Sequence, residues 1–92
     1  MDIRVYSSFV VAADLLNITA AAQRLNLTQS ALSRQIMALE AHLGVKLFEK
    51  TGRNIRLTAD GEALGAKIQT LLAAERDLRV LAGGPPRPAQ LT

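Results

Sequence analysis

The chain has 92 residues, of which 49% are hydrophobic and 21% charged, and its formal net charge is +3 at pH 7. This length fits one small domain with a modest core, and the composition differs from that of disordered proteins. The absence of cysteine excludes a disulfide scaffold and a thiolate metal site. The sequence has no signal-peptide pattern and no apolar stretch near the roughly 18 residues of a membrane span, so we expect a soluble, cytoplasmic protein.

Basic charge is concentrated in the middle of the chain. Residues 19–58 contain six Lys or Arg side chains and two Glu side chains, a local charge of +4. The remaining residues contain five basic and six acidic side chains, a local charge of −1. A polyanionic partner is therefore expected to bind the middle of the chain.

The N-terminal part predicts two helices. Residues 3–16 are expected to be helical because their apolar side chains recur at three- and four-residue spacing and share one face. A short second helix is expected over residues 19–25, where small, strong helix formers allow close approach of another helix. Asn17 or Thr19 can cap it by accepting a hydrogen bond from a free backbone N–H.

A third helix is predicted over residues 29–43. Thr28 is a good N-terminal cap, and Gly44 stands where the helix C-terminus needs a positive φ. Two helices joined by a short turn, the second with a polar face, are the helix-turn-helix arrangement. The apolar stripe of this helix consists of Leu32, Ile36, Leu39 and Leu43.

Two short extended segments are expected at residues 46–50 and 55–58. The connection Thr51-Gly52-Arg53-Asn54 suits a hairpin turn. Because a two-stranded hairpin is marginal alone, it must pack on the helices.

A long fourth helix is predicted over residues 59–82, capped by Thr58 and about 36 Å long. One edge of its apolar seam can pack on the domain, the remainder would be exposed in a monomer, and Glu75 interrupts it. From residue 83 onward, Gly and Pro cannot continue the helix and indicate a flexible tail. The seam consists of Leu64, Ile68, Leu71, Leu72, Leu78 and Leu81.

These elements predict a mainly α protein: a winged helix-turn-helix over residues 1–58, a linker or dimerisation helix over 59–82 and a flexible tail over 83–92. The order of the elements, together with the residues that follow, resembles the N-terminal DNA-binding domain of bacterial LysR-type transcriptional regulators. The resemblance covers roughly residues 1–82 and is most specific over residues 19–62. It is carried by Thr19-Ala20-Ala21-Ala22-Gln23-Arg24-Leu25-Asn26-Leu27-Thr28-Gln29-Ser30-Ala31-Leu32-Ser33-Arg34-Gln35-Ile36, Leu39-Glu40, Leu43-Gly44, Leu47-Phe48-Glu49-Lys50 and Leu57-Thr58-Ala59-Asp60-Gly61-Glu62.

The chain departs from this pattern in two places. Ser30 stands where many relatives have proline, a change that can alter base preference without breaking the fold. Asn17 and Ile18 replace a more usual small and aromatic residue, respectively, which we interpret as a local packing variation. Such regulators also carry a large C-terminal effector-binding domain, so a chain that ends at Thr92 is expected to be either an excised domain or a truncated protein.

The polar face of the third helix is the predicted base-reading surface. The N-terminal part of a recognition helix enters the major groove, and the resemblance implies base contacts at the same positions. Arg34 can donate two hydrogen bonds to guanine, and Gln29 can pair similarly with adenine. The resemblance also implies that Arg53, at the hairpin turn, reaches into a minor groove. The predicted base contacts are Gln29, Ser30, Ser33, Arg34 and Arg53, and Met37 lies on the same helix face.

Phosphate contacts and a dimer complete the expected mode of DNA binding. Phosphate contacts supply affinity and register without reading sequence. We expect a homodimer on a dyad-symmetric promoter site through the seam of the fourth helix defined above, and a tetramer is possible with the effector domain. The phosphate candidates are Thr19, Arg24, Thr28, Lys50 and Arg56.

Enzyme activity, a cofactor and a metal site are not expected. His42 is the only histidine, and Asp60 and Glu62 lie in a first helical turn, where negative charge is stabilising. The sequence has no nucleophile–base constellation, phosphate-cradling glycine loop or metal-ligand spacing. Two alternatives remain: a helical dimerisation or protein-interaction module without specific DNA binding, and a structure-selective RNA binder. The second lacks a base-stacking platform, since the three aromatic side chains appear in core patterns.

Overall fold

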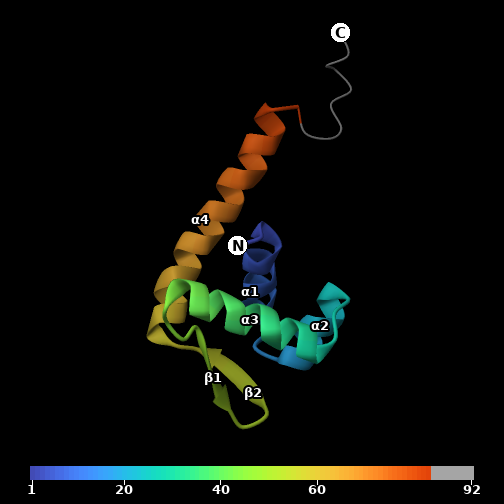
Figure 1. The fold of residues 1–92 in the computed structure, drawn as a ribbon, viewed down its shortest axis with the longest axis vertical. Coiled ribbons are helices and arrows are strands. Elements are labelled where there is room, and N and C mark those ends of the chain that lie inside the picture. The colour runs from blue at the N-terminus through green and yellow to red at the C-terminus, as the bar shows by residue number, and fades with distance from the viewer. Residues whose placement is uncertain (84–92) are drawn as a thin grey trace.

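The computed structural model describes residues 1–83, which form four helices and one two-stranded hairpin (Figure 1). This architecture confirms the mainly α winged helix-turn-helix fold with a long last helix. Apart from Gly83, the predicted flexible tail lies outside the described residues. The elements are α1 (Ile3–Leu15), α2 (Ile18–Leu25), α3 (Gln29–Leu43), β1 (Phe48–Thr51), β2 (Asn54–Leu57) and α4 (Ala59–Leu81).

Each of the four helices is preceded by a residue whose side chain accepts a hydrogen bond from a free backbone N–H of the first turn. Thr28 and Thr58 cap α3 and α4 as predicted. Asn17, rather than Thr19, caps α2, so this helix begins one residue earlier than predicted. Asp2 caps α1, and its hydrogen bonds from the Arg4 side chain and backbone lower the pKa of the Asp2 carboxyl. The predicted first helix ends one residue early because Leu16 adopts the left-handed conformation, with φ 52°.

The core consists of two adjoining clusters that join the helix-turn-helix to its neighbours. One lies between α1, α2 and α3 and also receives Ile55 of β2. Its contacts are close because Ala21 and Ala22, both small and buried, allow α2 to approach. The other joins α1, the end of α3 and α4, and includes Phe9, Leu39, Leu47 and Ile68.

The hairpin is a short antiparallel ladder in which Phe48 pairs with Leu57 and Thr51 with Asn54. Its two-residue turn begins at Gly52, whose φ of 65° is accessible to glycine without strain. Phe48 holds the base of the hairpin to α1, with its ring centroid 5.3 Å from that of Phe9. We call residues 48–57 the wing.

The predicted strand boundaries were shifted. The first strand was expected at residues 46–50 but begins at Phe48, and the second was expected at 55–58 but is Asn54–Leu57. The reason lies at Leu47, whose backbone N–H donates to the Glu40 side chain at 2.8 Å instead of to a neighbouring strand.

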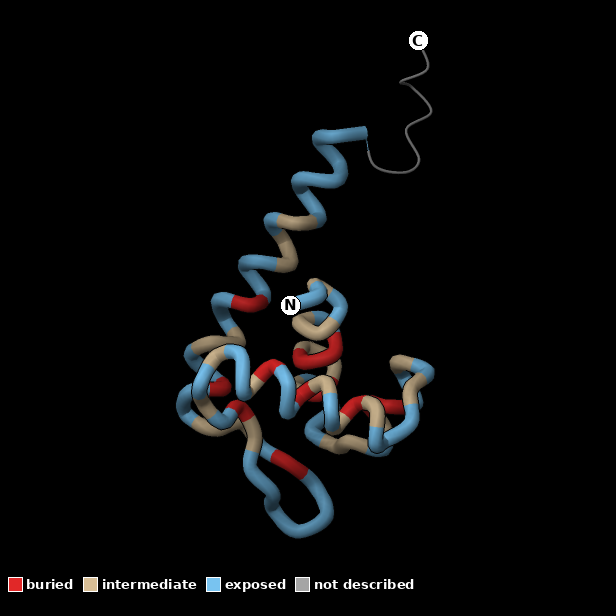
Figure 2. Tube along the Cα trace, viewed as in Figure 1, coloured by how far each residue is buried: buried red, intermediate tan, exposed pale blue. Residues whose placement is uncertain are grey.

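The helix α4 packs on the domain only along its N-terminal part, as far as Leu72. Figure 2 shows buried and half-buried stretches in that part and a mostly exposed C-terminal part that extends away from the other elements. Among the described residues, no helix is long and apolar enough to cross a membrane.

Candidate nucleic-acid interface

The polar face of α3 is open to solvent, as the sequence predicted. Gln29, Ser30 and Arg34 are exposed, and Ser33 is half-buried. Met37, which is 63% exposed, extends this face by one turn. The opposite face holds the helix in the core through Leu32, Ile36 and Leu39.

The wing lies beside this face of α3. Ser33 and Met37 of α3 line one groove together with Lys50 of β1, so a predicted base contact and a predicted phosphate contact border the same hollow. Arg53 is exposed in the turn of the wing, separate from the residues of α3. The structure therefore places the predicted base contacts on two elements, the helix α3 and the hairpin (Figure 1).

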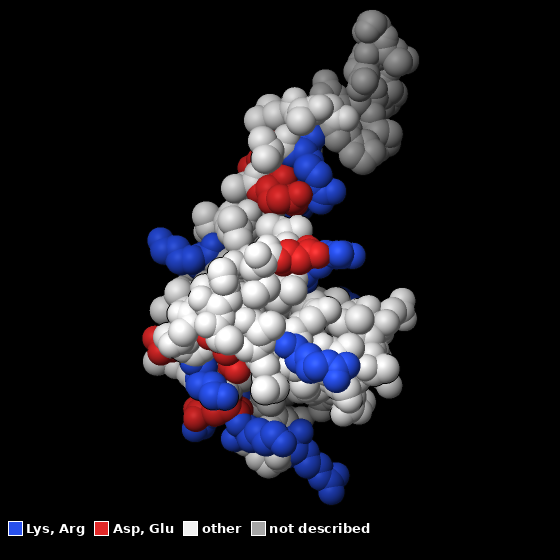
Figure 3. Space-filling model, viewed as in Figure 1, with Lys and Arg blue, Asp and Glu red and all other residues white. Residues whose placement is uncertain are grey.

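Four predicted DNA contacts are cations without an acidic partner. Within residues 1–83, Arg24, Arg34, Lys50 and Arg53 form no ion pair, and all four are exposed. Figure 3 shows basic side chains gathered at the end of the molecule that carries the wing. Arg56 differs, because its Nε donates to the Glu49 carboxylate across the wing at 2.9 Å. Its remaining guanidinium N–H groups stay available to a phosphate.

The two threonine candidates differ in their local roles. The Thr28 hydroxyl oxygen accepts from the Ala31 backbone N–H at 3.0 Å, which leaves its own proton free to be donated. Thr19 lies exposed in the first turn of α2, where Asn17 provides the cap. Both threonines lie at the N-terminal ends of the two helices of the helix-turn-helix, where partial positive charge favours an anion.

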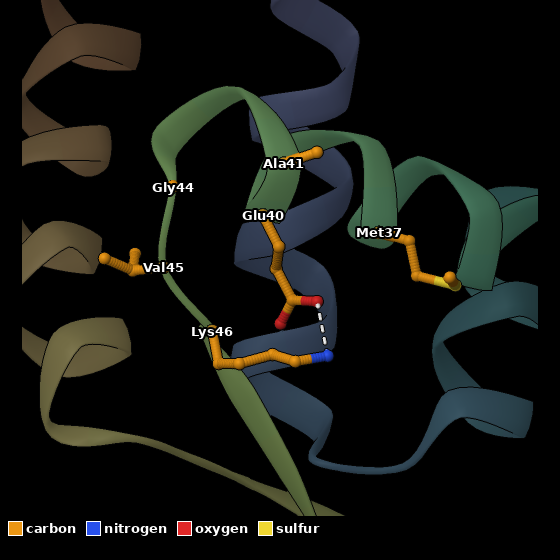
Figure 4. Close-up of a pocket in the computed structure, with 6 residues that line it drawn as sticks. All are labelled: Met37, Glu40, Ala41, Gly44, Val45 and Lys46. Atoms are coloured by element: carbon orange, nitrogen blue, oxygen red, sulfur yellow. Dashed lines mark ion pairs between the residues drawn. The ribbon is translucent and has the colours of Figure 1, made fainter.

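Glu40, whose importance the sequence did not reveal, connects α3 to the wing. Its carboxylate accepts from the backbone N–H groups of Leu47 at 2.8 Å and Phe48 at 3.3 Å. Lys46 approaches the same carboxylate, with 3.8 Å between Nζ and Oε1 (Figure 4). The carboxylate thus satisfies two backbone donors at the entry to β1. The sequence signal that could have identified Glu40 is an acidic side chain next to the apolar stripe of a helix in a basic segment.

A second attachment joins the wing to the α1–α2 turn. Asn17 Nδ2 donates to Asn54 Oδ1 at 2.8 Å, and the Ile55 backbone N–H donates to the Leu16 carbonyl at 3.3 Å. In the sequence, Asn17 indicated a helix cap and a local packing variation, and Asn54 indicated a turn. Their side-chain contact spans 37 residues and has no local pattern.

Comparison with known proteins identifies the family. Residues 3–62 match the description "Bacterial regulatory helix-turn-helix protein, lysR family". The chain belongs to the LysR family. This confirms the predicted resemblance and places a LysR DNA-binding domain in this chain, in a family of transcriptional regulators and not of enzymes.

Among LysR-family relatives, the chain is 49% identical over 76 residues to the HTH-type transcriptional regulator TfdS of Cupriavidus pinatubonensis, covering 83% of this chain and 26% of that protein. It is 39% identical over 79 residues to an uncharacterized HTH-type transcriptional regulator of Azotobacter vinelandii in the ibpB–leuC intergenic region, covering 86% of this chain and 55% of that protein. The chain therefore spans about a quarter to a little over half the length of these relatives.

Two solved LysR-family structures match almost the whole described chain. The crystal structure of the CbnR_DBD–DNA complex matches with a TM-score of 0.78 and 39% identity, over 90% of this chain and 98% of that one. The BenM_DBD/benA site 1 DNA complex matches with a TM-score of 0.83 and 30% identity, over 89% of this chain and 95% of that one. Both are complexes of those domains with DNA.

The six seam residues of this LysR-family chain divide into two sets. Leu64, Ile68 and Leu72 pack into the second core cluster, where Ile68 is only 5% exposed. The others lie outside both clusters, and Glu75 within the seam is paired with Arg79 at 2.8 Å. The exposed members are Leu71, Leu78 and Leu81, which are 43%, 65% and 82% exposed.

Proposed function

We propose that this chain binds double-stranded DNA in a sequence-specific manner, as the DNA-binding domain of a cytoplasmic LysR-type regulator that controls transcription from a dyad-symmetric promoter site. The observation that carries the proposal is the exposed polar face of α3 beside a wing with unpaired cations. In this proposal residues 1–58 bind DNA and residues 59–82 link two subunits. The solved DNA complexes of the CbnR and BenM domains support it.

Base recognition is assigned to the first turns of α3. Gln29, Ser30, Ser33 and Arg34 enter the major groove, where Arg34 donates to guanine O6 and N7. Arg53 enters the adjacent minor groove, whose negative potential is strongest where A·T pairs narrow it. The Ser30 hydroxyl can donate a hydrogen bond to an acceptor on a base edge or accept one from a donor there. Many relatives have proline at this position, which offers neither.

Phosphate binding is assigned to the remaining candidates. Arg24 and Lys50 have no acidic partner among residues 1–83, so neutralising a phosphate breaks no ion pair there. Thr19 and Thr28 add hydroxyl donors at helix N-termini, and Arg56 adds its free guanidinium donors. Each phosphate neutralised releases condensed counterions, so binding weakens with salt.

Two variants separate base reading from phosphate binding. On a duplex selected from a randomised library, Arg34→Ala should weaken binding by about 1–3 kcal/mol and relax discrimination at one base pair per half-site. Lys50→Ala should weaken selected and scrambled duplexes alike and reduce the slope of log affinity against log salt by about one unit. Fluorescence anisotropy at several salt concentrations measures both effects. If Arg34→Ala weakens the two duplexes equally, Arg34 does not read bases.

Dimerisation is assigned to the exposed half of α4. Burial of Leu71, Leu78 and Leu81 against the same helix of a second chain gives a two-fold contact, although association entropy offsets part of the gain. The interruption at Glu75 favours a partial or antiparallel pairing over a continuous coiled coil. Two recognition helices would then meet half-sites about one helical turn apart.

The dimer is tested by placing a charge in the exposed seam. Leu71→Lys should leave the fold intact, because Leu71 is outside both core clusters, but should yield monomers that bind a full site far more weakly. Gln69→Lys is the matched control, because it adds the same charge at an exposed position about 200° around the helix. Sedimentation measures the association. An unmodified chain that is monomeric at high micromolar concentration, and binds one half-site as tightly as two, contradicts the proposal.

A further inference from the structure

The wing of this chain is fastened near its tip as well as at its base. We propose that Asn17 and Asn54 form a clamp that holds the wing tip against the helix-turn-helix and so positions Arg53 for the minor groove. The inference rests on the proposed function, because it assigns these two asparagines as positioning residues for the wing contact. We call the Asn17–Asn54 hydrogen bond the wing clamp.

The geometry of the wing clamp is fixed by the cap of α2. Asn17 Oδ1 accepts from the Ala20 backbone N–H at 2.8 Å. Because a backbone N–H can only donate, the amide oxygen of Asn17 must face Ala20, and its NH₂ group must face the wing. Asn54 Oδ1 accepts a hydrogen bond from this NH₂ group at 2.8 Å. One asparagine side chain thus caps a helix of the DNA-binding motif and holds the wing.

A backbone hydrogen bond reinforces the clamp at the next residue. The Ile55 N–H donates to the Leu16 carbonyl at 3.3 Å, so consecutive wing residues are bound to consecutive residues of the α1–α2 turn. The Ile55 side chain is buried in the first core cluster directly behind this contact. Hydrogen bonding and apolar packing therefore hold the same point of the wing.

The position of the clamp determines what it can do. Asn54 directly follows Arg53 and pairs with Thr51 to close the turn. Each strand of the wing has only four residues, and a two-stranded hairpin is marginal on its own. Glu40 and Phe48 hold the opposite end, at the start of β1. Without the clamp the turn would be free to move, and ordering it on DNA would cost entropy.

Two variants remove the clamp while leaving the cap and the core in place. Asn17→Ser keeps a side-chain oxygen that can cap α2 but is too short to reach Asn54. Asn54→Ala removes the acceptor at an exposed position. Affinity is measured for two selected duplexes that differ only in whether the steps flanking each half-site are A·T or G·C. Amide hydrogen exchange at Ile55 reports on the attachment directly.

Each variant should lower the preference for A·T flanks by about two- to tenfold, the range of a single hydrogen bond. The double variant should lower it no further than either single one, and Ile55 should exchange faster in all three. In an Arg53→Ala background, neither substitution should change the preference. Thermal unfolding of each variant establishes that it is folded at the assay temperature.

The outcomes distinguish the clamp from the wing contact on which it depends. If Arg53→Ala leaves the preference for A·T flanks unchanged, the minor-groove role in the proposed function fails. If Arg53→Ala abolishes the preference but folded Asn17→Ser and Asn54→Ala retain it, the clamp is overturned and the wing contact stands. Equal losses on both duplexes that persist with Arg53→Ala would also overturn it, since they would show a general effect on the fold.

Discussion

Substitution of Gly61 by alanine should destabilise the domain, although alanine is the better helix former. An added Cβ would overlap the backbone carbonyl oxygen of Leu47, and would lie 3.0 Å from both the Leu47 carbonyl carbon and Leu57 Cδ2. That oxygen also accepts the Thr58 backbone N–H at 3.0 Å. Because a backbone carbonyl cannot rotate aside, the first turn of α4 must move away from the segment that enters the wing.

Two opposing effects determine how much Gly61→Ala changes the free energy of unfolding. Overpacking costs about 1–3 kcal/mol, and a backbone clash belongs at the upper end. The higher helix propensity of alanine returns about 1 kcal/mol. We expect Gly61→Ala to lower the free energy of unfolding by about 2 kcal/mol. Gly65→Ala is the matched control, because its Cβ would meet only Phe9 ring carbons at 3.4 Å, and it should be neutral or stabilising by up to about 1 kcal/mol.

Urea unfolding of both variants at one protein concentration measures this difference, since a dimer would make stability depend on concentration. The structure predicts a difference of about 2–3 kcal/mol between the two variants. Equal stabilities for Gly61→Ala and Gly65→Ala would refute the close approach of α4 to Leu47.

Two further substitutions test local features. Leu16→Gly should be neutral or stabilising by up to about 1 kcal/mol, because the left-handed conformation of Leu16 costs a non-glycine residue roughly 1–2 kcal/mol. Leu15→Gly, at the last helical residue of α1, should instead cost up to about 1 kcal/mol. Glu40→Ala should cost about 1–3 kcal/mol because it leaves two backbone donors unpaired, whereas Glu40→Gln, which retains an acceptor oxygen, should recover much of that loss. Thermal or urea unfolding measures each pair, and a Gln variant no better than the Ala variant would show that Glu40 acts through its charge alone.

Helix boundaries were predictable where local chemistry determines them. The third helix runs from Gln29 to Leu43 as predicted, because Thr28 caps one end and Gly44 ends the other with φ 76°. Both signals depend only on residues within the helix or next to it. The first helix was predicted one residue too long, because the apolar pattern includes Leu16 although its backbone has already left the helix.

The wing was harder to place because its pairing depends on distant groups. An extended pattern at residues 46–50 does not reveal which backbone donors a neighbouring strand takes up. Leu47 O still accepts from Thr58, but Glu40 accepts the Leu47 N–H, which interrupts that pair, so the ladder begins at Phe48. The Asn17–Asn54 contact was missed for the same reason.

The seam of α4 shows what apolar periodicity cannot distinguish. Ile68 and Leu71 both continue the predicted seam, but Ile68 is buried in the core of its own chain and Leu71 is 43% exposed. Their spacing is equally consistent with packing inside one chain or between two. Only the arrangement of α1 and the end of α3 shows which side of α4 is already covered.

The charge of the central segment acquires a more specific meaning from the structure. Its two acidic side chains are both engaged with cations of the same segment, Glu40 with Lys46 and Glu49 with Arg56. The local charge of +4 over residues 19–58 therefore corresponds to four individual cations without an ion-pair partner in the described part of the chain, and not to a diffuse excess. All four are exposed on α2, α3 or the wing, the elements that the sequence assigned to DNA. A protein-interaction module has no need to leave four cations unpaired on two helices and the neighbouring wing, whereas a polyanion supplies the missing charge at each of them. The four are Arg24, Arg34, Lys50 and Arg53.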